Sequence, residues 1–123
     1  MKSANTGLKR ILVAFKYSFD GFKSAFKSEA AFRQDCLVFI IGTIIALLLA
    51  LPLWQKALLI ASLLLILLME LVNTAIETVI DRISQEYHEL SKKAKDIGSL
   101  LVLLSFTNAI LIWGCFLYEV FAK

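Results

Sequence analysis

Acidic side chains lie inside the most hydrophobic part of this 123-residue chain. The segment from Lys56 to Asp81 reads KALLIASLLLILLMELVNTAIETVID, and it contains Glu70 and Glu77 with Asn73 between them. Placing an ionised carboxylate in a membrane helix costs about 2.5–3.5 kcal/mol, so such residues usually serve a function. At about 100° per residue, the acidic residues and Asn73 fall on one stripe of a helix. We expect this stripe to face protein, metal or water rather than lipid.

The depth of each polar residue indicates where chemistry takes place. Counted from the outer end of the segment, Glu70 lies about 21 Å along the helix and Glu77 about 31 Å. Because the hydrocarbon core is about 30 Å thick, Glu77 is expected at the level of the inner headgroups. Glu29, Lys95 and Asp96 are expected at the same level. Glu70 should lie about 10 Å deeper in the membrane.

This layering predicts chemistry between a soluble anion and a lipid headgroup. Mg²⁺ typically binds one or two carboxylates together with the phosphates of a substrate, which makes Glu29 and Glu77 its candidate ligands. Lys95 and Arg10 are candidates to contact phosphate oxygens. Glu70, partly removed from water, could accept a proton from a lipid hydroxyl group. The sequence has no GxxxxGK[ST] loop and no Gly-rich dinucleotide motif, so a nucleotide would need a different kind of site.

The composition predicts an all-α membrane protein with three transmembrane helices. Hydrophobic residues make up 59 % of the chain, against about 45–50 % in soluble domains. Three segments are long enough to cross a bilayer, at about 36–54, 57–80 and 97–120. The first starts too late and is too long for a cleaved signal peptide. Cys36 and Cys115 have no metal-ligand spacing and are expected to be buried thiols.

The distribution of Lys and Arg predicts the orientation in the membrane. Seven of these residues precede the first span and four lie between the second and third, whereas the outer connection has only Lys56 and the carboxyl terminus only Lys123. The amino terminus, including Lys2, and the second connection are therefore expected in the cytoplasm. The net charge of +3 reflects this asymmetry, and no basic stripe of the nucleic-acid-binding type accompanies it.

The region before the first span is predicted to form an amphipathic surface helix. Between residues 8 and 32, apolar residues recur every three or four positions and lysines every seven. This face suits either a membrane surface or the protein's own helix bundle, and both interpretations stay open. Asp20-Gly21 is a predicted break between two shorter helices. We expect one domain over residues 1–123, with 1–34 as the surface region and with the second connection extending its flanking helices around a short turn.

At these positions the chain resembles the prokaryotic diacylglycerol kinase family of small integral-membrane lipid kinases. The matching stretches are EAAFRQD (29–35), MELVNTAIETVIDRI (69–83) and EYHELSKKAKDIGS (86–99), supported by RILVAFKYSFDG near the start. The resemblance runs from about Gly7 to about Trp113. It implies a homotrimer with active sites between subunits at the cytoplasmic face of the bacterial inner membrane. It also implies transfer of the γ-phosphate of MgATP to the sn-3 hydroxyl of diacylglycerol, giving phosphatidic acid.

The resemblance further implies a role for individual residues. Glu70 would be the catalytic base, and Glu29 and Glu77 the Mg²⁺ ligands. The residues expected to surround the nucleotide are Arg10, Tyr17, Glu29, Glu77, Glu86, His88, Lys95 and Asp96. The residues expected to approach the lipid are Ala14, Glu70, Ser99 and Trp113.

Simpler roles remain open for several of these residues. Glu29 could pair with Arg33 one helical turn later. Glu77 could offset the positive charge of Arg82. Asp81 could either bind metal or form an ion pair with Arg82. Trp113 could anchor the helix in the membrane interface, as tryptophans often do.

Two other functions also remain open. A related small kinase could phosphorylate undecaprenol, whose hydroxyl lies at a similar depth. A small proton-coupled transporter could use Glu70 as a proton relay. That alternative gives no purpose to the cytoplasmic Lys95-Asp96 cluster.

Overall fold

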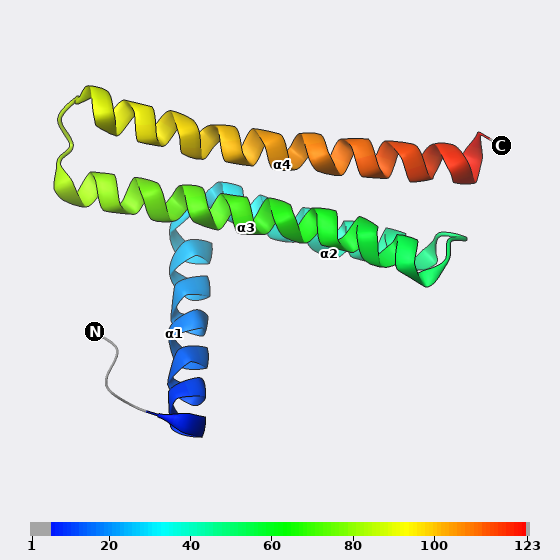
Figure 1. Ribbon diagram of the computed structural model, residues 1–123, viewed down its shortest axis with the longest axis horizontal. Coiled ribbons are helices and arrows are strands. Elements are labelled where there is room, and N and C mark those ends of the chain that lie inside the picture. The colour runs from blue at the N-terminus through cyan, green and yellow to red at the C-terminus, as the bar shows by residue number, and fades with distance from the viewer. Residues whose placement is uncertain (1–5, 123) are drawn as a thin grey trace.

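The computed structural model describes residues 6–122, so Lys2 and Lys123 lie outside the described part of the chain. Four helices follow one another, namely α1 (Gly7–Ser28), α2 (Ala30–Leu48), α3 (Leu53–Ile83) and α4 (Glu89–Phe121) (Figure 1). Among the described residues there is no strand. Three helices, α2, α3 and α4, are long and apolar enough to cross a membrane. The prediction of an all-α membrane protein with three spans is confirmed.

Helix α3 is the centre of the bundle and packs against both α2 and α4. Its buried residues include Leu59, Leu63, Ile66 and Glu70, which recur every three or four positions and so form one continuous face. Small residues allow close approach of the neighbouring helices. At Gly42 of α2, an added Cβ would overlap the Cδ1 atom of Leu63, so only glycine permits this spacing without a shift.

The predicted break at Asp20-Gly21 is wrong, because α1 is a single continuous helix. An isolated glycine inside a helix costs only about 1 kcal/mol relative to alanine, so Gly21 does not end it. The chain turns instead at Glu29, whose backbone is extended (φ −116°, ψ 108°). The Arg33 side chain stabilises this corner by donating from Nη1 to the carbonyl oxygen of Phe26 at 2.6 Å.

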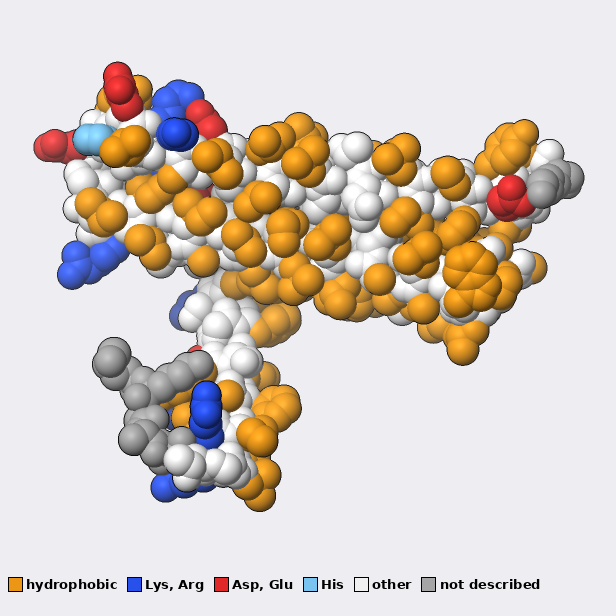
Figure 2. Space-filling view, in the orientation of Figure 1, with side chains coloured by type: hydrophobic (Ala, Val, Ile, Leu, Met, Phe, Trp, Pro, Cys, Tyr) orange, Lys and Arg blue, Asp and Glu red, His pale blue; other side chains and the backbone are white. Residues whose placement is uncertain are grey.

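Helix α1 projects from the bundle at a steep angle (Figure 1). Its apolar side chains remain exposed, with Leu8 72 %, Phe15 69 % and Phe19 63 % accessible. Only near the corner does an aromatic side chain of α1, Phe22, contact Phe32 of α2, with ring centroids 5.6 Å apart. In Figure 2 the hydrophobic side chains of α1 face the side on which the apolar part of the bundle extends, and Lys and Arg side chains lie on other sides. Within this chain, the arrangement favours the membrane-surface interpretation of α1.

The order of helices and connections is as predicted, but the helices end at other residues than expected. Helix α2 ends at Leu48 rather than near residue 54, because Pro52 precedes α3 as its N-cap and α3 begins directly after it. At the opposite end, α3 and α4 continue beyond the level of α1 and are joined by residues 84–88 (Figure 1). The predicted helical extension around a short second turn is confirmed.

Candidate active site

A pair of buried carboxyl groups lies between α2 and α3. Glu70 is 7 % exposed and Asp35 is 8 % exposed. The two side chains are near enough for a hydrogen bond between them when one carries a proton. The Oδ2 atom of Asp35 is buried and has no partner among the described residues. Glu70 therefore has a second acidic group beside it, within a largely apolar bundle.

Asp35 is not among the site residues predicted from the sequence, although its position along the chain indicates its depth. Asp35 lies six residues after Glu29, which places it about 9 Å deeper along a helix. Glu70 lies about 10 Å deeper than Glu77 by the same measure. Because α2 starts at the inner surface and the antiparallel α3 ends there, Asp35 and Glu70 come to about the same depth.

The predicted metal ligands lie around this pair. The charges of both Glu77 and Glu29 act on Glu70, so three elements, α2, α3 and the α1–α2 corner, contribute acidic groups to one region. In the described part of the chain, neither Glu29 nor Glu77 forms an ion pair. Arg33, the alternative partner of Glu29, contacts the end of α1 instead. No basic side chain of the described residues therefore neutralises either carboxylate through an ion pair.

The donor set fits Mg²⁺ that enters together with a nucleotide. Within residues 6–122, no group of three or more His, Cys, Asp or Glu side chains is arranged to hold a metal ion by itself. Mg²⁺ does not require such a group, because it usually keeps phosphate and water oxygens and takes only one or two carboxylates from the protein. Glu29 and Glu77 supply that number.

A polar cavity of about 350 Å³ lies where α3 and α4 are joined. Its size is within the range of small-molecule sites, about 300–1,000 Å³. It is lined by four residues that the sequence analysis assigned to the nucleotide, Glu86, His88, Lys95 and Asp96. Lys92, which we expected only to orient the protein in the membrane, also lines it. The fold thus gathers residues from Ile80 to Asp96, up to sixteen positions apart, around one cavity.

The start of α4 forms one wall of this cavity. His88 is the N-cap residue, and its Nδ1 atom accepts the backbone N–H of Leu90 at 3.1 Å. In the neutral ring the proton is therefore on Nε2, which can act as a donor. The first turn of a helix carries unpaired N–H groups and a partial positive charge, which favour an anion.

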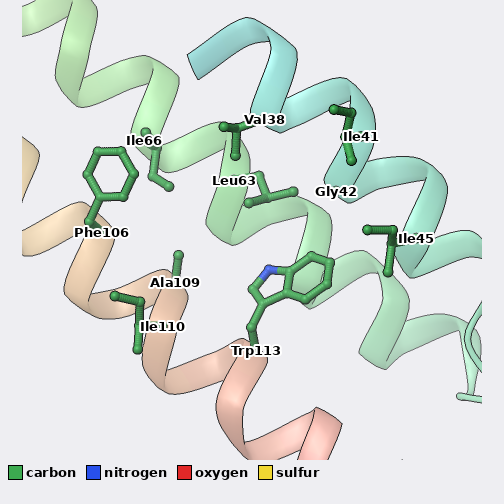
Figure 3. Close-up of a pocket in the computed structure, with 10 residues that line it drawn as sticks. All are labelled: Val38, Ile41, Gly42, Ile45, Leu63, Ile66, Phe106, Ala109, Ile110 and Trp113. Carbon is green, nitrogen blue, oxygen red and sulfur yellow. The ribbon is translucent and has the colours of Figure 1, made fainter. Parts of the chain in front are cut away.

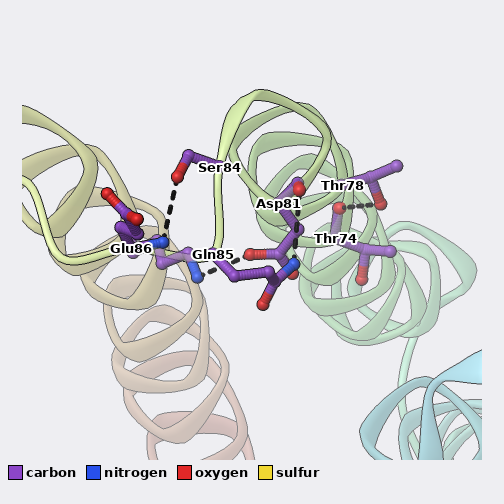
Figure 4. A network of polar contacts seen from close by, with 7 residues as sticks. Thr74, Thr78, Asp81, Ser84, Gln85 and Glu86 are labelled. Carbon is purple, nitrogen blue, oxygen red and sulfur yellow. Dashed lines mark hydrogen bonds and ion pairs between the residues drawn. The ribbon is translucent and has the colours of Figure 1, made fainter.

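Local hydrogen bonds stabilise the connection between α3 and α4 (Figure 4). The backbone N–H of Glu86 donates to Ser84 Oγ at 3.0 Å, and Gln85 Nε2 donates to the carbonyl oxygen of Asp81 at 3.2 Å. These contacts fix the turn that places Glu86 and His88 beside the cavity.

Two ion pairs involve the lysines of the cavity. Lys92 Nζ lies 2.6 Å from Asp96 Oδ2 within α4, and Lys95 Nζ lies 2.8 Å from Asp81 Oδ1 on α3. Asp81 thus pairs with Lys95 rather than with Arg82, its predicted partner. The hydrogen bond to Asp81 raises the pKa of Lys95 above the ordinary lysine value, so this side chain stays positively charged at neutral pH.

Some predicted site residues are not brought to the cavity of their own chain. Arg10, Ala14 and Tyr17 are exposed on α1, which packs mainly against α2. Ser99 is exposed on α4. The structure of one chain therefore assembles only part of the predicted nucleotide site.

Trp113 lies farther along α4, away from the polar cavity. It lies beside an apolar groove of about 360 Å³ formed by α2, α3 and α4 (Figure 3). Its indole Nε1 donates to Ser62 Oγ at 3.1 Å and to the carbonyl oxygen of Leu59 at 3.3 Å. These bonds attach α4 to α3, while the ring lines the groove next to Gly42. The groove lining is suited to hydrocarbon.

These features define a small helical membrane protein with a polar site at one end of its bundle. Residues 16–117 match the family described as prokaryotic diacylglycerol kinase, and the chain belongs to that family. It is 41 % identical to diacylglycerol kinase of Escherichia coli K12 over 98 % of this chain and 99 % of the relative. It is 47 % identical to that of Pseudomonas aeruginosa over 91 % of each chain, and 42 % identical to that of Haemophilus influenzae over 92 % and 96 %.

Proposed function

We propose that this chain is an ATP-dependent diacylglycerol kinase that produces phosphatidic acid. The observation that carries the proposal is that the charge of Glu77 acts both on the buried Glu70 carboxyl group and on Lys95, which lines the cavity, so this carboxylate connects the two. A lipid hydroxyl at headgroup depth would lie between a proton acceptor and a site for phosphate groups. Family membership supports the same reaction.

The proposed reaction is a direct transfer between the two substrates. Glu70 accepts the proton of the lipid hydroxyl as its oxygen bonds to the γ-phosphorus, and the bond from that phosphorus to the ADP oxygen breaks. Lys95 offsets negative charge on the phosphate oxygens, and His88 Nε2 and the start of α4 bind the nucleotide with Glu86 and Asp96. Mg²⁺, held by Glu29 and Glu77, would supply further neutralisation of phosphate charge.

We propose that the site is completed by a second copy of the chain in a homotrimer. Arg10 and Tyr17 would then contact the nucleotide of a neighbouring subunit, and Ala14 would approach the lipid together with Ser99 and Trp113. This assembly gives a purpose to residues that α1 holds away from the cavity of its own chain. The positive charges around α1 and the α3–α4 connection support a cytoplasmic amino terminus in a bacterial inner membrane.

The test is an assay of labelled phosphate transfer from ATP to diacylglycerol, with undecaprenol as a parallel substrate. Glu70→Gln should lower turnover by about 100-fold or more, the usual contribution of a general base. Asp20→Asn, an exposed change on α1 outside the proposed site, should have little effect. Wild-type turnover in Glu70→Gln would refute the proposed base. Labelling of undecaprenol alone would reassign the substrate, and labelling of neither lipid would refute the kinase.

A further inference from the structure

Asp81 and Lys95 form an ion pair that joins two helices at the edge of the cavity. The 2.8 Å contact connects the last turns of α3 with the second turn of α4. The side chains are 40 % (Lys95) and 46 % (Asp81) exposed, so the pair lies at the surface rather than in a dry core. The other lysine pair of the cavity, Lys92 with Asp96, lies within one helix and imposes no constraint between helices.

Stability alone does not account well for this contact. Exposed ion pairs usually contribute little to the free energy of unfolding, because solvent screens the charges and the side chains lose freedom. The contact also restricts where the Lys95 ammonium group lies. Its four-carbon stem is flexible, and its ammonium group has three N–H donors, of which the contact with Asp81 Oδ1 uses one. Two donors of a group held at the cavity therefore remain for a ligand.

We propose that Asp81 is a positioning residue for the nucleotide, which holds the Lys95 ammonium group at the cavity edge where phosphate oxygens bind. The inference rests on the proposed kinase function and deepens it. Without Asp81, Lys95 would retain its charge but would need to be ordered each time a nucleotide binds. Ordering one long side chain costs about 0.5–1.5 kcal/mol of binding free energy.

The expected effect is specific to the nucleotide. Asp81→Ala should raise both the KM for ATP and the Kd of a non-hydrolysable ATP analogue by about two- to tenfold. The kcat at saturating ATP and the KM for diacylglycerol should change less than twofold. Asp81→Glu keeps the charge and should recover part of the lost affinity. Asp20→Ala, which removes an exposed acidic side chain on α1, is the matched control and should leave the Kd unchanged.

A double-mutant cycle in the purified full-length protein provides the decisive test. If Asp81 acts through Lys95, Asp81→Ala should cause no further loss of analogue affinity when Lys95 is already replaced by methionine. A loss that persists in the Lys95→Met background would refute the positioning role, as would an unchanged Kd in Asp81→Ala alone. A wild-type protein that neither binds the analogue nor phosphorylates lipid would instead refute the proposed function.

Discussion

The contact between Gly98 of α4 and Asn73 of α3 offers a direct test of how helix packing supports the site. Gly98 is buried, and a Cβ atom added there would overlap Asn73 Oδ1. The same atom would lie 3.3 Å from Asn73 Cγ and 3.5 Å from Ile76 Cδ1. In Gly98→Ala, either the Asn73 side chain must turn or α3 and α4 must separate.

The magnitude follows from two opposing effects. Overfilling a packed contact costs about 1–3 kcal/mol, whereas alanine is favoured over glycine in a helix by about 1 kcal/mol. Gly114→Ala isolates the second effect, because that position lies in the same helix and a Cβ there meets nothing within 4 Å. Gly98→Ala should therefore have a free energy of unfolding about 1–3 kcal/mol lower than that of Gly114→Ala.

Turnover should respond more strongly than stability. Asn73 lies about one helical turn from both Glu70 and Glu77, so a shift of α3 at this point moves the proposed base and metal ligand. A displacement of about 1 Å in such a site can lower the rate by about 100-fold. The assays are detergent unfolding and ATP-dependent lipid phosphorylation. Equal stability and equal turnover in Gly98→Ala and Gly114→Ala would refute the predicted displacement of α3.

Two further substitutions test the metal ligand and the membrane core. Glu77→Gln should raise the Mg²⁺ concentration needed for half-maximal turnover at least tenfold, because an uncharged amide is a weak Mg²⁺ ligand; titration of activity with Mg²⁺ measures it. Trp113→Phe should lower the free energy of unfolding by about 0.6–1.7 kcal/mol, because it removes the N–H that bonds to Ser62 within the membrane; unfolding in detergent measures it.

Each of these two predictions has a control variant and a result that would contradict it. For the metal, Asp20→Asn should leave the titration unchanged, and a normal titration in Glu77→Gln would exclude that residue as a ligand. For the core, Trp54→Phe is the matched change, since the edge-to-face contact with Phe116 persists with a phenyl ring. Equal stability in Trp113→Phe and Trp54→Phe would show that the indole hydrogen bonds contribute nothing.

The fold was predictable because membranes impose simple rules. Apolar length identifies the spans, and the positions of Lys and Arg predict their direction. The rise of about 1.5 Å per helical residue likewise placed Glu70 deeper in the membrane than Glu77. The predicted break at Asp20-Gly21 was wrong because glycine weakens a helix without ending it, whereas the actual corner at Glu29 depends on a side-chain contact from α2 that no local pattern indicates.

The sequence by itself determined the helices, the acidic stripe on one of them and the chemistry that such residue types can perform. Which residues of different helices meet was decided by the tertiary structure. Asp35 faces Glu70 and Asp81 pairs with Lys95 because of how the helices are rotated about their axes. That rotation results from packing at small residues such as Gly42, a property of two surfaces together, and periodicity along one segment does not encode it.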